Sequence, residues 1–165
     1  MSFIQESIVF DRAHKDSKFG PGPWLYEPDS AEWYAHGLPC MLLRDGSTGV
    51  WRAYVGVYVE HALYGVNAHE ADALIDKPSR PHGGITYAST CQPFNCSEKT
   101  RRVARVTADW WFGFDAAHPF DLVPSVFALL PPQNSVHAPA YTYRGMAFMQ
   151  AQCETLAAQL AALAA

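Results

Sequence analysis

Residues 50–59 read VWRAYVGVYV, and this stretch decides the fold class. Every second residue from Trp51 to Val59 is apolar, whereas the positions between them include Arg52 and Tyr54. A period of two is typical of a β-strand that places one face in the core and the other in a more polar environment. The stretch therefore predicts a strand with Trp51 on its core face.

The sequence on both sides of this strand supplies further strands. Residues 38–44 (LPCMLLR) are a short apolar run, and the turn-forming residues 45–49 (DGSTG) predict a hairpin that joins this run to the first strand. Residues 84–89 (GITYAS) and 109–114 (DWWFGF) are rich in β-branched and aromatic residues, and turn formers flank both. We therefore expect about four or more strands.

A long helix is expected at the C-terminal end. From Tyr143 onward, apolar residues recur at steps of three and four, with alanine in most other positions, which is typical of a helix with a narrow apolar stripe. The stripe consists of Met146, Met149, Cys153, Leu156, Leu160 and Leu163. We favour a helix lying across the sheet over a coiled-coil dimer seam, because fewer than about three heptads rarely hold a coiled coil.

Three other segments have weaker patterns. Residues 2–14 place apolar residues among polar ones and predict a short amphipathic helix. Residues 19–28 (FGPGPWLYEP) hold three prolines and two glycines, so we expect an extended loop that wraps the surface with aromatic anchors. Residues 61–81 predict a surface loop with a short helical turn around residues 69–75.

Length and composition favour one domain. The chain has 165 residues, of which 49% are hydrophobic and 17% are charged, and a single core normally serves ~100–200 residues. We expect a single α+β domain built on a mainly antiparallel sheet, with the C-terminal helix packed on it. Its parts are an N-terminal helix and wrapping loop (1–37), the sheet and site loops (38–121) and the C-terminal helix (143–165).

Composition also excludes several classes of function. The net charge is −4, so no broad attraction to nucleic acid is expected. No apolar run approaches the ~20 residues that span a bilayer, and the N-terminus lacks the order of a signal peptide. The four cysteines fit neither a disulfide scaffold nor a zinc motif. We expect a soluble cytoplasmic protein with reduced thiols, without membrane contact; a homodimer stays open.

The first candidate site follows the strand at 109–114. Asp115, His118 and Asp121 lie in a run where Pro119 prevents a regular helix, so the three side chains share a tight loop. An aspartate beside a histidine can supply an oriented general base, and the three side chains can also form part of a divalent-metal site. The alternative is that Asp115 caps the following turn and His118 is a packed loop residue.

The second candidate site precedes the strand at 84–89. Gly83 and Gly84 leave backbone N–H groups accessible, in concavities that suit phosphates or oxyanions, and His82 beside them can exchange a proton with the bound group. Thr86 shares a face with Gly84 and is expected to join the site. The alternative is an ordinary Gly-Gly turn.

Basic and aromatic residues add further candidates. The basic cluster can form an anion site with arginine forks suited to phosphate, or be a solvated loop; it consists of Lys99, Arg101, Arg102 and Arg105. We expect His61, Arg52 and Tyr54 to join the same pocket. Aromatic residues can stack on a base or sugar, although core packing is the commoner role; these are Trp24, Tyr87, Trp110 and Trp111.

Four short pieces of the sequence read GLPC (37–40), YVGV (54–57), HGGITY (82–87) and WWFGFDAAHPFD (110–121). Together they resemble a family of small, largely uncharacterised proteins of bacteriophages and prophages. The resemblance covers about residues 27–121 and the terminal helix. Members often read GH-P after the YVGV strand, whereas here residues 60–62 (EHA) keep the histidine and lack the proline. The resemblance implies a phage or prophage setting within a bacterial cell, and no particular reaction.

These features together lead us to expect a small phage-type hydrolase that acts on a nucleotide-like or phosphate-bearing small molecule. One histidine would deprotonate water and another would protonate the leaving oxygen, directly or through a divalent metal held among His82, Asp115, His118 and Asp121. The expected catalytic residues are His82, Asp115, His118, Asp121 and His61. The expected substrate-binding residues are Gly83, Gly84, Thr86, Arg52, Tyr54, Arg102 and Arg105. The alternatives are a non-catalytic phage protein that sequesters a nucleotide immune signal and a module that binds a host protein.

Overall fold

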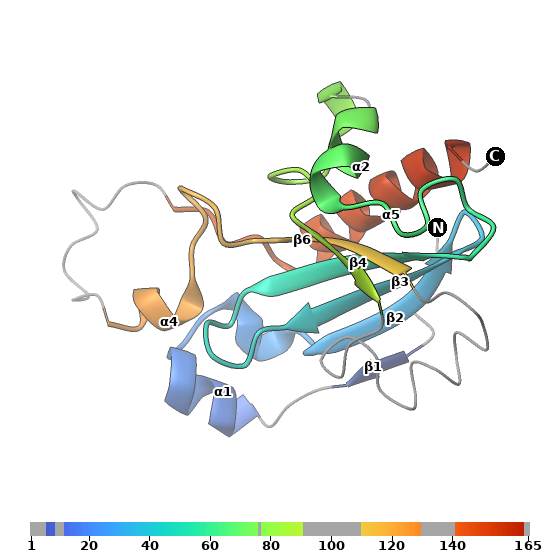
Figure 1. The fold of residues 1–165 in the computed structure, drawn as a ribbon. Coiled ribbons are helices and arrows are strands. Elements are labelled where there is room, and N and C mark those ends of the chain that lie inside the picture. The colour runs from blue at the N-terminus through green and yellow to red at the C-terminus, as the bar shows by residue number, and fades with distance from the viewer. Residues whose placement is uncertain (1–5, 9–11, 76, 91–109, 130–140, 164–165) are drawn as a thin grey trace.

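The computed structural model describes residues 6–8, 12–75, 77–90, 110–129 and 141–163. Within these ranges it contains a six-stranded sheet in the order β1-β2-β3-β4-β6-β5, in which all neighbouring strands are antiparallel (Figure 1). The strands are β1 (Glu6–Ile8), β2 (Ser30–Ala35), β3 (Leu38–Arg44), β4 (Trp51–Val57), β5 (Tyr87–Thr90) and β6 (Trp110–Asp115). The α-helices are α1 (Arg12–Phe19), α2 (Ala68–Leu74), α4 (Pro124–Phe127) and α5 (Met146–Ala162), with short 3-10 helices η1 (Pro23–Tyr26) and η2 (Lys77–Ser79). The expected single α+β domain is confirmed.

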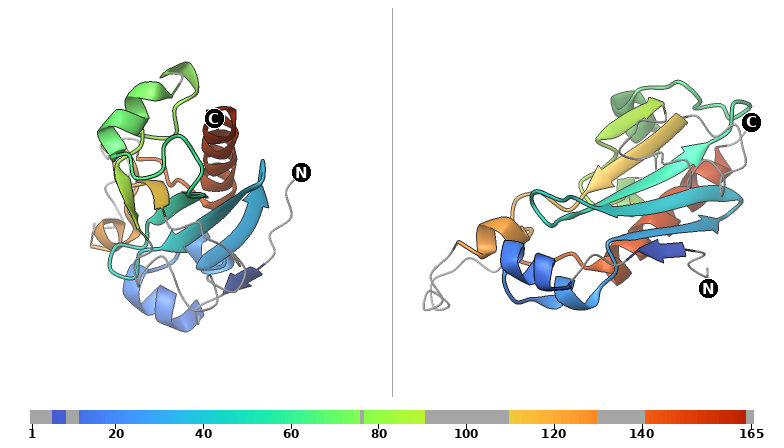
Figure 2. Two further views of the ribbon diagram at one scale, coloured as in Figure 1. Left: turned by 45° about the vertical axis from the view of Figure 1, so that its right-hand side comes forward. Right: turned by 90° about the horizontal axis from the view of Figure 1, so that it is seen from below.

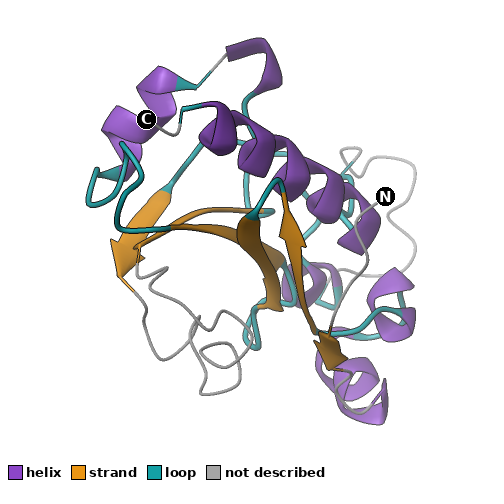
Figure 3. Ribbon diagram, turned by 90° about the vertical axis from the view of Figure 1, so that its right-hand side faces the viewer, coloured by secondary structure: helices purple, strands orange, loops and turns teal. Residues whose placement is uncertain are grey.

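The core lies between the sheet and α5, as the two periodic patterns predict. Trp51, Ala53 and Val55 of β4 have no exposed surface and belong to one buried cluster with apolar residues of the helix. Helix α5 packs across β3 and β4 on one face of the curved sheet (Figure 3). Four members of its apolar stripe are fully buried: Met149, Cys153, Leu156 and Leu160. Since burying a leucine side chain contributes ~1.5–3 kcal/mol, this seam is a major source of stability.

The N-terminal part differs from the sequence prediction. The described residues of the expected helix at 2–14 contain strand β1, which pairs with β2, and only then does α1 begin at Arg12. Strand β2 was not predicted, although Ala31, Trp33 and Ala35 alternate as buried residues along it. Hydrogen bonding to a neighbouring strand outweighs the weak helical period here, because a few residues of apolar spacing carry little intrinsic helix stability.

Other segments follow the prediction with shifted ends. Residues 19–28 are not fully extended, because Pro23–Tyr26 within them form η1; Trp24 is buried as an anchor, whereas Tyr26 is 76% exposed. Helix α2 confirms the predicted helical turn, and β5 starts three residues later than predicted, at Tyr87. Helices α1 and α4 lie side by side at one end of the sheet (Figure 2). No helix in the described part of the chain is long and apolar enough to cross a membrane.

A buried ionic network joins the segment before β2 to β3. Asp29, whose side chain has no exposed surface, lies 3.0 Å from Nζ of Lys15 and 2.5 Å from Nε of Arg44. The Lys15 ammonium also donates to the carbonyl oxygens of Trp24 and Glu27, both at 2.8 Å. The carboxylate of Asp29 therefore compensates two buried cations at once.

The same network reaches the start of α5. Arg44 donates from Nη1 to the hydroxyl of Tyr143 at 2.9 Å, and this hydroxyl donates to Oε1 of Glu27 at 2.6 Å. The other carboxylate oxygen of Glu27 accepts a hydrogen bond from the backbone N–H of Met146, the first residue of α5. Because the first N–H groups of a helix have no partner within it, Glu27 caps α5 and complements its dipole.

The antiparallel pairing of β5 with β6 brings the two candidate loops together. Tyr87 at the start of β5 lies opposite Gly113 near the end of β6, so the residues before β5 and those after β6 meet at one end of the sheet. A parallel bridge between Asp121 and Thr142 then places the residues before α5 at the same end.

Candidate functional site

Asp121 lies at the centre of this meeting point. Its side chain is 1% exposed, and Oδ2 accepts hydrogen bonds from Nε2 of His82 at 2.7 Å and from the backbone N–H of His118 at 3.0 Å. Oδ1 accepts a hydrogen bond from Nε of Arg144 at 3.0 Å. Burial acts to raise the pKa of Asp121, but the hydrogen bonds from these three groups outweigh it and lower the pKa below its ordinary value. Asp121 is therefore a buried, ionised carboxylate that joins three segments.

Because the pKa of Asp121 is lowered in the folded state, the stability of the fold should decrease at acidic pH. A carboxyl whose pKa is lower in the folded than in the unfolded state stabilises the fold above its unfolded pKa of about 3.9, and this contribution is lost as the pH falls through the folded value. We expect the free energy of unfolding, measured by urea titration, to decrease as the pH falls below about 4. Asp121→Asn should be less stable at neutral pH and show a flatter acid dependence; identical pH curves for the two proteins would contradict this.

His82 presents an oriented imidazole. Its Nε2–H donates to Asp121, so in the neutral ring Nδ1 carries a lone pair and can accept a proton. Nδ1 makes no hydrogen bond to the described residues, and the side chain is 19% exposed. The rings of His118 and Phe148 meet the imidazole edge to face, with centroids 5.2 and 5.4 Å away. The backbone N–H donates to Oε1 of Gln152 at 3.0 Å, which fixes the loop against α5.

A cavity of about 540 Å³ adjoins this imidazole, and we call it the His82 cavity. It is lined by Arg80, Pro81, His82, Gly83, Gly84, Arg144, Phe148 and Gln152. Its volume falls in the range of small-molecule sites, which is roughly 300–1,000 Å³. The cavity is bounded by the loop before β5 on one side and by the first turns of α5 on the other.

Of the residues that the structure describes, two arginines supply positive charge to the His82 cavity, and neither was among the sequence candidates. The guanidinium carbon of Arg144 lies 4.7 Å from the centroid of the Phe148 ring. The Nε–H of Arg144 donates a hydrogen bond to Asp121, so the two terminal nitrogens remain able to bind an anion. Arg80 pairs with Asp72 at 2.5 Å and remains 42% exposed. Arg80 directly precedes residues 81–84 (PHGG), and this position in the sequence could have identified it as a candidate. Arg144 reaches the cavity through its long-range contact with Asp121, which the sequence does not indicate.

Gly83 and Gly84 shape the loop and do not form the expected pair of free amides. Their φ angles are +75° and +77°, a region that favours glycine. The N–H of Gly84 donates to the carbonyl of Pro81 at 2.7 Å, so it is not available to an oxyanion. A Cβ added to Gly83 would lie 2.1 Å from Nε2 of His118. The glycines therefore close a tight turn and allow His118 to approach.

The contact between Gly83 and His118 leads to a matched pair of variants. Gly83→Ala should destabilise the fold by about 2–4 kcal/mol, because an alanine there combines backbone strain with a clash against His118. Gly37 has φ +78° but no atom within 4 Å of an added Cβ, so Gly37→Ala carries the strain alone, about 1–2 kcal/mol. Urea unfolding of both variants measures the difference. Equal losses would show that the contact with His118 is unimportant.

His118 and Asp115 lie beside this centre without lining the His82 cavity. Nε2 of His118 is 3.5 Å from Oδ1 of Asp115, yet it makes no hydrogen bond with suitable geometry. Oδ1 of Asp115 accepts from the backbone N–H of Ala117 at 3.0 Å, which is the turn-capping role that the alternative reading predicts. His118 holds Asp121 through its backbone N–H, and its ring packs on His82.

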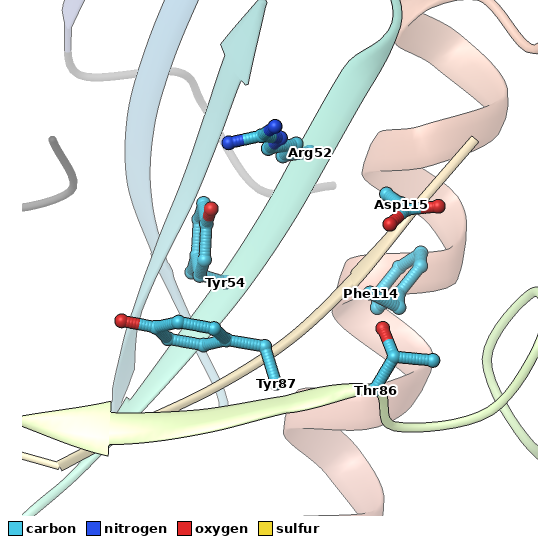
Figure 4. A pocket seen from close by; sticks show the side chains of 6 residues that line it. All are labelled: Arg52, Tyr54, Thr86, Tyr87, Phe114 and Asp115. Carbon is cyan, nitrogen blue, oxygen red and sulfur yellow. The ribbon is translucent and has the colours of Figure 1, made fainter. Parts of the chain in front are cut away.

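A second cavity, of about 380 Å³, is lined by the remaining substrate-binding candidates that the structure describes. We call it the sheet-face cavity; it is lined by Arg52, Tyr54, Thr86, Tyr87, Phe114 and Asp115 (Figure 4). Arg52 and Tyr54 lie on the face of β4 opposite the residues packed on α5, whereas α5 itself bounds the His82 cavity. Arg52 and Tyr54 are therefore separate from the His82 cavity, because the alternation of β4 turns these side chains away from α5.

His61 lies apart from both cavities. Its Nδ1 accepts from the N–H of Leu63 at 3.0 Å, and its Nε2 bonds to the carbonyl of Leu160 at 2.7 Å. Leu160 is ~12 Å along α5 from Gln152, the residue that contacts the His82 loop. The expectation that His61 joins the site is corrected: its ring bonds to a carbonyl in the last turns of α5, which also accepts a hydrogen bond from the backbone N–H of Leu163 at 3.1 Å.

The basic cluster, with Arg102 and Arg105, lies outside the described residues, as do Cys91 and Cys96. Cys40 and Cys153 are buried free thiols. Among the residues that the structure describes, no group of three or more His, Cys, Asp or Glu side chains could hold a metal ion. Since N–H donors occupy both carboxylate oxygens of Asp121, the set of His82, Asp115, His118 and Asp121 does not fit a metal centre.

Comparisons with known proteins found no match to the chain among family models, curated proteins or solved structures. The chemistry offered by the described residues is one oriented imidazole, one buried carboxylate and two arginines around the His82 cavity. An imidazole backed by a carboxylate is suited to proton transfer, and guanidinium groups are suited to binding phosphate or carboxylate.

Proposed function

We propose that the protein is a small hydrolase of the phage or prophage type that its sequence resembles, acting on a phosphate-bearing, nucleotide-like small molecule. The observation that carries this proposal is the hydrogen bond from His82 to the buried Asp121 at the wall of a cavity that Arg80 and Arg144 also line. A carboxylate behind an imidazole orients the ring and stabilises the imidazolium that forms when it takes up a proton.

The proposed reaction uses His82 twice. Nδ1 takes a proton from water while the water oxygen forms a bond to phosphorus and the bond from phosphorus to the leaving oxygen breaks. The imidazolium, stabilised by Asp121, then returns the proton to the leaving oxygen, so that His82 is neutral again. The terminal nitrogens of Arg144, with Arg80, bind the phosphoryl oxygens and offset the charge that develops on them. His118 has no proton-transfer role in this scheme; it positions Asp121.

A second candidate function, binding without turnover, is favoured by one observation. Among the described residues that line the His82 cavity, His82 is the one histidine, and no carboxylic acid lines the cavity beside it. A protein that sequesters a nucleotide signal needs the two arginines but no second proton donor. Hydrolysis remains the first candidate because simple anion binding gives no reason to aim an imidazole, backed by a buried carboxylate, at the cavity.

The test is incubation of the purified protein with nucleotides, cyclic dinucleotides and ADP-ribose derivatives, followed by chromatography of the products. Binding is measured first by the thermal unfolding midpoint, since a ligand at ~100 times its Kd stabilises by about 2.7 kcal/mol. A stabilising compound that is consumed supports the hydrolase. A stabilising compound recovered intact contradicts hydrolysis and supports sequestration. Neither effect across the panel would contradict both and favour the module that binds a host protein.

A further inference from the structure

The two arginines that line the His82 cavity belong to different elements. Arg144 lies just before α5, and its Nε–H donates to Oδ1 of Asp121, the carboxylate whose Oδ2 accepts from His82. Arg80 lies in the loop before β5 and pairs with Asp72 of α2 at 2.5 Å. Arg144 is therefore tied to the same carboxylate as the reacting imidazole, whereas Arg80 is held by a separate one.

Arg80 is fixed at the wall of the cavity. Oδ2 of Asp72 accepts a hydrogen bond from Nη2 of Arg80, and Oδ1 accepts one from the backbone N–H of Ile85 at 2.8 Å. A Cβ added to Gly84 would collide with Nη2 of Arg80, so the guanidinium lies directly against the loop. Nε and Nη1 of Arg80 make no hydrogen bond to the described residues and remain able to bind an anion.

The polar groups of the His82 cavity favour a ligand with two phosphates. A guanidinium binds one phosphate through two parallel hydrogen bonds, so two arginines can hold two phosphates. Oε1 of Gln152 already accepts from the N–H of His82, which leaves the amide N–H groups of Gln152 for a ligand. No carboxylate of a described residue lines the cavity to repel an anion. The volume of about 540 Å³ accommodates two linked phosphates.

The position of the reacting groups restricts the leaving group. In phosphoryl transfer the attacking and leaving oxygens lie roughly in line, on opposite sides of the phosphorus. One imidazole nitrogen therefore cannot take a proton from the attacking water and give it to the leaving oxygen at the same moment. The proton returns only after the bond to the leaving oxygen has broken, so the leaving group must depart as an anion.

The other acidic groups near the cavity do not supply that proton. Hydrogen bonds lower the pKa of Asp121, so it is ionised, and the buried Nε2 of His118 belongs to a ring that does not line the cavity. An alkoxide is about as basic as hydroxide, whose parent water has a pKa of about 15.7, whereas the second pKa of a phosphate is about 6. A phosphate therefore departs as an anion far more readily than an alkoxide.

We propose that the His82 cavity takes a phosphoanhydride, such as a nucleoside diphosphate, in preference to a simple phosphate ester. This inference rests on the proposed function, because it names the bond that His82 would hydrolyse. Arg144 holds the phosphoryl group under attack, and Arg80 holds the phosphate that leaves. The water oxygen bonds to phosphorus, and the bridging P–O bond breaks with its electron pair on the leaving oxygen. Nδ1 of His82 takes the water proton and later releases it to that oxygen.

The first experiment compares rates at substrate saturation for two matched pairs of compounds. Adenosine diphosphate should be converted to adenosine monophosphate and phosphate, whereas the monophosphate, whose leaving group is an alkoxide, should react at least about a hundredfold more slowly. p-Nitrophenyl phosphate and phenyl phosphate each carry one phosphate and differ in the acidity of the phenol. The nitrophenyl ester should react about a hundredfold faster, because no proton assists the departure of either phenol.

The second experiment measures binding of pyrophosphate and of phosphate by isothermal titration calorimetry. Pyrophosphate should bind at least about tenfold more tightly, because each arginine takes one phosphate. Arg80→Gln should raise the Kd of pyrophosphate about tenfold and leave that of phosphate nearly unchanged. Arg80 is exposed, so this variant should fold, which thermal unfolding checks. Lys18→Gln removes the same charge at an exposed position of α1 and should leave both Kd values unchanged.

Equal rates within either pair of substrates would overturn the inference while hydrolysis stands. If none of the four compounds is consumed, the proposed hydrolysis fails, and the binding experiment decides the inference. A tight pyrophosphate complex that Arg80→Gln weakens would then support a diphosphate ligand that is held without turnover. Equal affinities for pyrophosphate and phosphate, or a pyrophosphate Kd that Arg80→Gln leaves unchanged, would overturn the inference.

Discussion

Replacing His82 with alanine is expected to lower turnover of a phosphate-bearing substrate by about 10²–10⁴-fold, the usual contribution of a positioned acid–base group. The reason is that the variant leaves Asp121 and the two arginines in place but removes the atom that takes the proton from water. Substrate binding should change little, because Arg80 and Arg144 remain. Turnover is measured by chromatography under substrate saturation, and affinity by calorimetry, so that the two effects separate.

The control for this variant is His69→Ala, an exposed histidine on α2 that lines neither cavity. It should retain full turnover. His82 also packs between His118 and Phe148, so its removal costs some stability, and both variants are assayed well below their unfolding midpoints. Full turnover by folded His82→Ala protein would contradict the hydrolase proposal. An equal loss in His69→Ala would mean that the effect is not specific to the cavity.

Replacing Asp29 with asparagine is expected to destabilise the fold by about 3–5 kcal/mol, the cost of leaving buried charges without their partner. Asparagine has nearly the same shape, so packing is retained while Lys15 and Arg44 lose the carboxylate that compensates them. Since the whole domain is expected to be stable by only about 5–15 kcal/mol, the loss should be visible as a large fall in the urea midpoint.

Asp16→Asn is the matched control for this prediction, because it makes the same chemical change at an exposed position of α1. It should alter the free energy of unfolding by less than about 0.5 kcal/mol. A loss below about 1 kcal/mol for Asp29→Asn would contradict the assignment of Asp29 as the shared partner of both cations.

Elements that carry their own period could be predicted from the sequence. The alternation around Trp51 identifies β4, and the apolar stripe around Leu156 identifies α5, because each pattern is a local property of one segment. Strands β1 and β2 could not be predicted in the same way. Strand β1 has three residues, and β2 buries two alanines, which are weak strand signals; the hydrogen bonds of both strands to their neighbours decide their state.

The candidate site was predicted in part. His82 and Asp121 form its centre, and both lie in loops that the sequence predicts, from the glycines beside His82 and from Pro119 near Asp121. Their meeting depends on the pairing of β5 with β6, which spacing cannot reveal. Arg144 was missed because a residue before a helix gives no sign of what the helix start approaches. His61 was misplaced because the exit of β4 leads toward the C-terminal end of α5.

The residues at the start of α5 are fixed from two sides, and this has a consequence for ligand affinity. Tyr143 and Met146 are tied to Glu27, while Arg144 between them is tied to Asp121. The conformational entropy of the Arg144 side chain is therefore largely lost during folding, and little of it remains to be lost when an anion arrives. The guanidinium of Arg144 is therefore preorganised for an anion. Its affinity for a ligand depends on Glu27, which lies before β2, more than one hundred residues earlier in the chain, and holds Tyr143 and Met146 in place.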